Sequence, residues 1–83
     1  MEVQAGKVRH FYSRISVASV EVTGMLSVGD FVHIRGHVTD FDQTIESMQV
    51  RCDQVSVALR GMTVGIKVKD YVRKNDYIYR IID

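Results

Sequence analysis

The feature that most constrains this sequence is its bias toward side chains that favour β-strands. Valine, isoleucine, threonine, tyrosine and phenylalanine make up 32 of the 83 residues, whereas there are only 2 leucines and 3 alanines. Branched and aromatic side chains pack well on a pleated sheet, and strong helix formers are scarce. The chain also contains no proline. The composition therefore predicts an all-β protein.

Length and charge set further limits. A chain of 83 residues, 46% hydrophobic and with a net charge of +1, suits one small domain spanning residues 1–83. No apolar run approaches the ~20 residues of a membrane-spanning helix, and the first residues, MEVQAGK, do not resemble a signal peptide. We therefore expect a cytoplasmic protein with no membrane partner. Its single cysteine, Cys52, cannot form an internal disulfide.

Glycine and polar residues divide the chain into short apolar runs, which predict six or seven strands. Alternation of apolar and polar residues points one set of side chains into the core and leaves Lys67 and Lys69 outside. His10 shares the phase of Val8, which predicts a histidine at the rim of the core. The runs are 3–12, 17–22, Phe31–Arg35, 39–50, 55–59, 63–69 and 77–82, and the predicted core residues are Val32, Ile34, Val64, Ile66 and Val68.

Two runs do not keep a single phase. In 39–50 the phase changes between Ile45 and Met48, which predicts a β-bulge near residues 46–47 and a bent strand. In 77–82 both faces contain apolar residues, so the inward phase stays open. Closure into a small antiparallel barrel would remove the exposed sheet edges. We therefore predict a closed β-barrel, with an open sandwich as the alternative.

Five short motifs follow one another along the chain: GKV at 6–8, LSVGDFVHIRG at 26–36, QTIESM at 43–48, GMTVGI at 61–66 and NDYI at 75–78. Their order resembles the β-barrel second domain of translation GTPases such as elongation factor Tu. It is also similar to small translation elongation factor-like proteins and to the C-terminal barrel of collagenase-like peptidases. The resemblance covers nearly the whole chain and departs at Asn75, where these families commonly have glycine.

The resemblance implies a non-enzymatic binding module. In translation factors this barrel docks on tRNA ends, ribosomal RNA or neighbouring domains, so the leading hypothesis is docking on RNA or a translation component. The alternative is a protein-interaction subunit that partners an enzyme such as a collagenase-like peptidase. The chain has no GxxxxGK[ST] loop, so we expect no GTP binding on its own and no cofactor.

Charge is segregated along the chain. Residues 1–20 carry a net charge of +2, residues 21–53 carry −4 and residues 54–82 carry +4. In a closed barrel the first and last strands lie near each other, so their cations would form one basic face. Such a face suits RNA or another polyanion, although solvated surface charge explains it as well. The residues of this predicted basic face are Lys7, Arg9, Lys67, Lys69, Arg73 and Lys74.

Other candidate sites are weaker. His33 and His37 lie near Asp40 and Asp42, but their placement on a strand and in a turn argues against a metal site. Cys52 has no histidine placed beside it by any motif, so we expect no catalytic residue. Four aromatic side chains are candidates for base stacking or, more often, for a protein interface. These are Phe31, Tyr71, Tyr77 and Tyr79.

Overall fold

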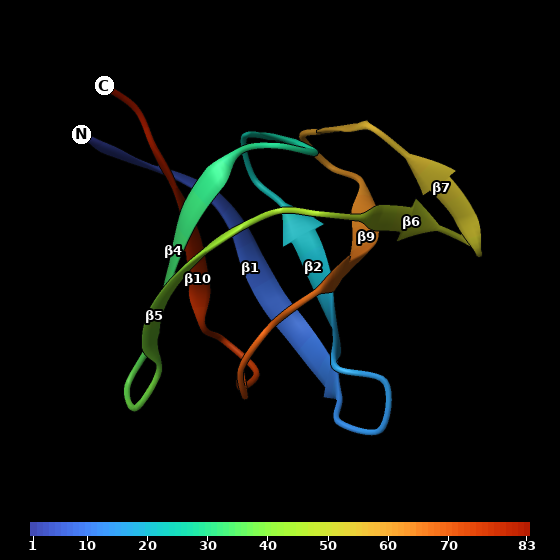
Figure 1. The fold of residues 1–83 in the computed structure, drawn as a ribbon, viewed down its shortest axis with the longest axis horizontal. Helices are drawn as coiled ribbons and strands as arrows, with labels where there is room; N and C mark the ends of the chain where they lie inside the picture. The colour runs from blue at the N-terminus through green and yellow to red at the C-terminus, as the bar shows by residue number, and fades with distance from the viewer.

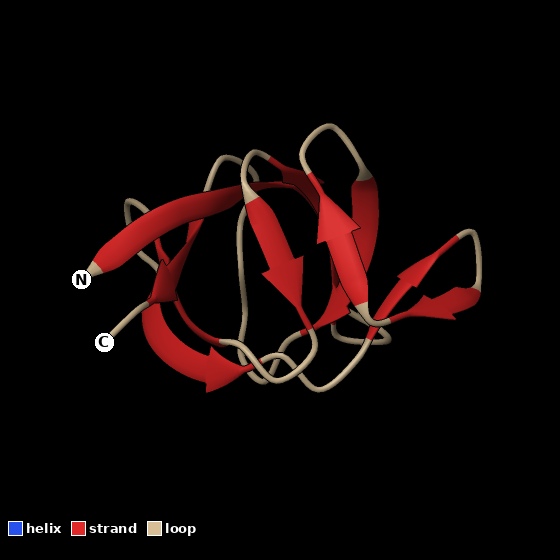
Figure 2. Cartoon of the chain, turned by 90° about the horizontal axis from the view of Figure 1, so that it is seen from above, coloured by secondary structure: helices blue, strands red, loops and turns tan.

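The computed structural model describes all residues 1–83 and contains strands and turns without a helix, which confirms the all-β class (Figure 2). No helix long and apolar enough to cross a membrane is present. The ten strands are β1 (Glu2–Tyr12), β2 (Val17–Val22), β3 (Met25–Ser27), β4 (Phe31–Arg35), β5 (Asp40–Thr44), β6 (Met48–Val50), β7 (Asp53–Val55), β8 (Val57–Leu59), β9 (Thr63–Lys67) and β10 (Tyr77–Ile81).

Eight strands form one antiparallel sheet in the order β5-β4-β10-β1-β2-β9-β6-β7, and β3 pairs with β8 in a second, two-stranded sheet. The longest strand, β1, lies between β10 and β2. The large sheet curls, and the two chain ends lie side by side (Figure 1). There the amino group of Met1 donates a hydrogen bond to the carbonyl oxygen of Ile82 at 2.9 Å.

The predicted closed barrel is not found, because the backbone ladder ends at the edge strands β5 and β7. The reason lies in residues 39–50, which we predicted as one bulged strand. The chain instead leaves β5, which pairs with β4, and continues into β6, which pairs with β9. Between them Ile45 is buried, donates to the Asp30 carbonyl and accepts from the Gly29 N–H. A crossing segment between two strands therefore replaces the bulge.

The side chain of Gln43 connects β5 to the end of β9, although these two strands do not pair through their backbones. Its Nε2 donates to the Lys67 carbonyl at 3.0 Å, and its Oε1 accepts from the Lys69 N–H at 2.9 Å. A carboxamide offers a donor and an acceptor side by side, as a peptide group does. One side chain thus makes the hydrogen bonds that a strand pair would make in a closed barrel.

The core is one cluster of sixteen buried apolar residues that includes all five predicted core residues. The open question about the last strand is also resolved: Ile78 is buried, while its neighbours Tyr77 and Tyr79 are partly exposed. Lys67 and Lys69 are exposed as predicted. The cluster consists of Ala5, Val8, Ala18, Val20, Val22, Leu26, Val32, Ile34, Ile45, Met48, Ala58, Val64, Ile66, Val68, Val72 and Ile78.

The prediction for His10 is wrong. The pairing of β1 with β2 shifts register between Val8 and His10, so the two side chains no longer share a face. His10 is exposed and packs edge-on against Tyr12, with ring centroids 4.4 Å apart. The same shift turns Phe11 toward the core, where it packs against Tyr71 at 4.7 Å.

Candidate binding surfaces

The largest cavity of the molecule, about 630 Å³, is an open groove beside the hairpin of β6 and β7, which projects from the body (Figure 1). We call it the hairpin groove. Its floor is formed by outward-facing residues of β2, β9 and β6, and its walls come from the turn after β1 and the turn after β6. The residues used below are Tyr12, Ile15, Val17, Gln49, Arg51, Cys52, Met62 and Gly65.

A glycine keeps the floor of the hairpin groove hollow. A Cβ at Gly65 would lie 3.2 Å from Val17 Cγ1 and 3.5 Å from Gln49 Cγ, so a side chain there would occupy the space between β2 and β6. The backbone at this position does not need a left-handed conformation. The hollow is therefore the main local consequence of glycine at position 65.

The wall formed by the turn after β1 is apolar and fixed in place. Tyr12 and Ile15 are 50% and 55% exposed, although both are large and apolar. The Nζ of Lys67 donates to the Ile15 carbonyl at 2.9 Å, and the Val68 N–H donates to the Ser16 carbonyl. Two contacts from the β9 end of the sheet thus hold this turn beside the groove.

The opposite wall contains an unusual tight turn. Arg51 and Cys52, which join β6 to β7, have φ angles of 50° and 71°, and Val50 pairs with Asp53 on either side of them. Two-residue hairpin loops of this kind strongly prefer Asn-Gly, because few other residues adopt positive φ cheaply. We did not single out the groove from the sequence, and a two-residue turn without asparagine or glycine is the signal that would have drawn attention to it.

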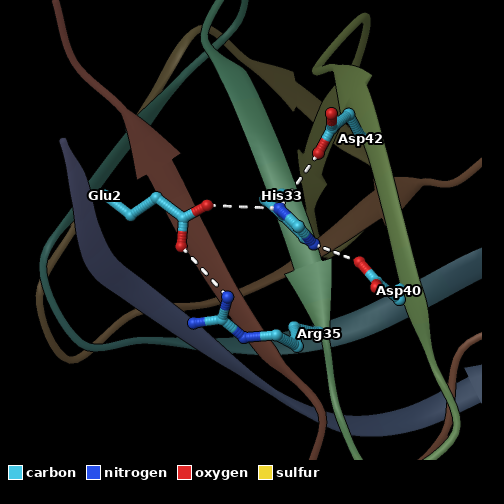
Figure 3. Close-up of polar contacts among 5 residues, drawn as sticks. All are labelled: Glu2, His33, Arg35, Asp40 and Asp42. Carbon is cyan, nitrogen blue, oxygen red and sulfur yellow. Dashed lines mark hydrogen bonds and ion pairs between the residues drawn. The ribbon is translucent and has the colours of Figure 1, made fainter.

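A cluster of polar side chains lies on the outer surface of β4, β5 and β1 (Figure 3). The Nδ1 of His33 lies 3.2 Å from Glu2 Oε2 and 3.1 Å from Asp42 Oδ1, while its Nε2 contacts Asp40. The Nη1 of Arg35 lies 3.4 Å from Glu2 Oε1. Both ring nitrogens of His33 therefore face carboxylates. The contacts join the edge strand β5 to β4 and to the start of β1.

Of the residues considered for metal binding or catalysis, His33, Asp40 and Asp42 contact one another, whereas His37 and Cys52 lie apart from them. No group of three or more histidine, cysteine, aspartate or glutamate side chains has the arrangement of a metal site. His37 is exposed in the turn between β4 and β5 and makes no side-chain hydrogen bond with His33. Cys52 is exposed in the wall of the hairpin groove, and no hydrogen bond joins it to a histidine.

The six residues of the predicted basic face lie on β1, β9 and the segment between β9 and β10, and most have individual contacts. Arg9 pairs with Glu21, and Lys67 binds the turn after β1. Arg73 Nη1 donates to Thr39 Oγ1 at 3.3 Å. Lys67 and Lys69 also line a second cavity of about 540 Å³ together with Asp42 and Glu46, so both signs of charge meet there. RNA binding by these cations remains a prediction.

The four candidate aromatic residues divide into two pairs. Phe31 and Tyr71 are 47% and 56% exposed, as the hypothesis of an interface requires. Tyr77 and Tyr79 are only partly exposed on β10 and have cations above their rings. Lys7 Nζ lies 5.7 Å from the Tyr77 ring centre, and the Arg35 guanidinium lies 4.6 Å from that of Tyr79. The Arg73 guanidinium also lies 5.1 Å from the ring centre of Tyr71, so Phe31 is the one candidate without a cation over its ring.

Curated relatives of the chain are proteins named as proteases. It is 34% identical over 79 residues to an uncharacterised protease of Methanocaldococcus jannaschii, a match that covers 94% of this chain and 19% of that protein. It is 33% identical over 81 residues to a collagenase of Porphyromonas gingivalis, a match that covers 95% of this chain and 20% of the collagenase. The chain thus spans about a fifth of the length of these relatives. No family model matches it.

Solved structures identify the fold. The C-terminal domain of a candidate U32 peptidase from Geobacillus thermoleovorans superposes with a TM-score of 0.89 and 23% identity, covering 98% of this chain and 93% of that one. The selenomethionine variant of the same domain superposes with a TM-score of 0.86, covering 90% of this chain and 95% of that one. The chain has the fold of this domain, and the collagenase matches in sequence support the predicted likeness to the C-terminal domain of collagenase-like peptidases. The likeness to the second domain of translation GTPases is not shown by these matches and stays a prediction.

Proposed function

We propose that this chain is a non-catalytic accessory module of collagenase-like, U32-type peptidases and that it acts by binding a protein partner. The observation that carries this proposal is the coverage of the sequence matches. Nearly the whole chain aligns with about a fifth of each relative, so the matched region is the size of one domain of those proteins. The matching fold was solved as a separate C-terminal domain, which supports an independent folding unit.

The chemistry of the surface supports a binding role. Both ring nitrogens of His33 face carboxylates, and Cys52 has no hydrogen-bonded base. Nucleophilic catalysis needs a nucleophile within hydrogen-bond reach of a base. The largest hollow is instead an apolar groove with half-exposed Ile15 and Tyr12 on its wall, and such exposed apolar surface is typical of an interaction site.

The proposal can be tested with the Porphyromonas gingivalis collagenase from which the matching fifth has been deleted. We expect the 83-residue chain to bind this truncated protein saturably in isothermal titration calorimetry, and to hydrolyse no gelatin by itself. Gelatin hydrolysis by the chain alone would contradict the non-catalytic role.

A matched titration with RNA separates the two binding hypotheses. Neutralising several phosphates releases counterions, so RNA binding weakens steeply as salt is raised. We expect no such binding, and reversal of Lys69 and Lys74 to glutamate should leave calorimetric binding to the truncated collagenase intact, because neither residue lines or supports the hairpin groove. RNA binding that falls with salt and is lost in the double variant, together with no binding to the truncated protein, would replace our proposal by the translation-related hypothesis.

A further inference from the structure

We propose that the hairpin groove binds an extended segment of a partner protein in which an apolar side chain stands next to a carboxylate. The proposal deepens the proposed function and rests on it only in taking the partner to be a protein. The cavity volume of about 630 Å³ is in the range of sites that enclose a few side chains or a small ligand, roughly 300–1,000 Å³. Its open shape admits a continuous chain.

The apolar part of the site is exposed in the free chain. Ile15 and Tyr12 are about half exposed on one wall, and Val17 and Met62 add aliphatic surface. Burial of such surface by a partner is favourable in proportion to the apolar area removed from water. Gly65 projects no side chain into the groove, which leaves its volume of about 630 Å³ to a side chain of the partner.

The charge of the groove selects an anion beside that side chain. Arg51 is the only charged residue among those that line the groove. On the other wall the ammonium of Lys67 is held at the Ile15 carbonyl. No acidic side chain lines the cavity, so Arg51 is the charged group that a carboxylate would meet there. Arginine can bind a carboxylate through two parallel hydrogen bonds, which fixes both position and identity.

The turn that forms the Arg51 wall of the groove has an unfavourable backbone conformation for its residues. Arg51 and Cys52 both keep positive φ angles where Asn-Gly would be easier. Strained backbone persists where surrounding structure or function requires it. Arg51 is among the residues that line the groove, so an unfavourable residue pair for this turn is found at the wall of the site.

The lining fits a peptide better than a nucleic acid. Single-stranded nucleic acids are held by aromatic stacking surfaces and by several cations along the backbone. The groove offers one aromatic ring, that of Tyr12, together with aliphatic side chains and a single lining cation, Arg51. We therefore commit to a protein segment.

The experiment is an NMR titration of the 15N-labelled 83-residue chain with two capped hexapeptides. The first is acetyl-Gly-Val-Phe-Glu-Val-Gly-amide, and the second has glutamine in place of glutamate. We expect the first peptide to shift the amides of Ser19, Gln49 and Gly65 saturably. Hydrogen bonds to a charged group are stronger than neutral ones, so the second peptide should bind about fivefold more weakly.

Three variants of the chain test the proposed roles of Arg51 and Ile15 in peptide binding. Arg51→Gln should bind both peptides equally, because the carboxylate loses its partner while the backbone keeps a non-glycine residue. Ile15→Glu should abolish the shifts, and the dispersion of its spectrum checks that it is folded. Lys74→Gln, an exposed loop cation that does not line the groove, is the matched control and should behave as the wild type.

The proposal is overturned if neither peptide causes shifts, if the shifts map away from the groove, or if the Arg51→Gln variant keeps the preference for glutamate. A decauridylate that shifts the groove amides more strongly than the peptide would also overturn it. Peptide binding without binding to the truncated collagenase would refute the proposed function alone. Binding to the collagenase that is unchanged in Ile15→Glu and Arg51→Gln would refute the groove alone.

Discussion

Two turns of the chain use the same hydrogen bonds in different surroundings. The turn at residues 27–30 precedes β4, and the turn at residues 73–76 precedes β10. In the first, Asp30 Oδ2 accepts from the Ser27 N–H at 2.9 Å, and the Asp30 N–H donates back to the Ser27 carbonyl at 3.0 Å. Gly29 supplies the left-handed residue, with φ 97°.

The second turn repeats this pattern. Asp76 Oδ2 accepts from the Arg73 N–H at 2.8 Å, and the Asp76 N–H donates to the Arg73 carbonyl at 3.0 Å. Asn75 is the left-handed residue, with φ 77°. The two turns then differ in packing. Asp76 is only 3% exposed and lies against Gly36, whereas Asp30 is partly exposed and a Cβ at Gly29 would meet no atom within 4 Å.

The comparison shows which part of a turn can be recognised locally. An aspartate three residues after its backbone donor, preceded by glycine or asparagine, defines the turn in both places. The free energy that the turn contributes depends on what packs against the aspartate. Gly36 and Thr39 contact the second turn, and Ile45 forms hydrogen bonds with the first. No local sequence pattern contains this information.

The largest effect is expected at Gly36. A Cβ there would lie 1.8 Å from Asp76 Oδ1 and 3.3 Å from its Cα, so Gly36→Ala must displace a buried carboxylate from its hydrogen bond. We expect a loss of about 2 to 4 kcal/mol in the free energy of unfolding, measured by urea denaturation. Gly29→Ala is the control and should lose only about 1 kcal/mol, from backbone strain. Equal losses would show that the two turns are packed alike.

The next effect concerns the aspartates themselves. Asp76→Ala removes a buried acceptor and should lower the free energy of unfolding by about 2 to 3 kcal/mol. Asp30→Ala should cost about 1 kcal/mol, because water can reach the freed N–H. Asp76→Asn keeps an acceptor oxygen and should recover more than half of the loss. The prediction fails if Asp30→Ala is the more damaging change in thermal and urea unfolding.

Much of the fold follows from the sequence because alternation is a local property. Phe31–Arg35 and 63–69 alternate without interruption, and Val32, Ile34, Val64 and Ile66 are buried as predicted. Asn75, which stands where the resembling families commonly have glycine, adopts a left-handed conformation. Each of these predictions depends on a residue and its immediate neighbours.

The wrong predictions occur where pairing with a strand distant in the sequence determines the register or the end of a strand. The register shift that exposes His10 arises from the pairing of β1 with β2, and the break at Ile45 arises because β5 and β6 pair with different strands. The candidate site was missed for the same reason. The hairpin groove brings together Ile15, Arg51 and Gly65, which are far apart in the chain, and no motif links them.

The smallest expected effect is at the left-handed residue, and it tests whether asparagine does there what glycine does in the first turn. Asparagine tolerates positive φ better than other residues with a Cβ, whereas alanine does not. Asn75→Gly should therefore change the free energy of unfolding by less than about 0.5 kcal/mol, since relief of strain is offset by the greater freedom of glycine in the unfolded chain. Asn75→Ala should lose about 1 kcal/mol by the same strain argument. The midpoints of urea unfolding of both variants provide the check. A neutral Asn75→Ala would mean that the buried Asp76, and not the conformation of residue 75, holds this turn.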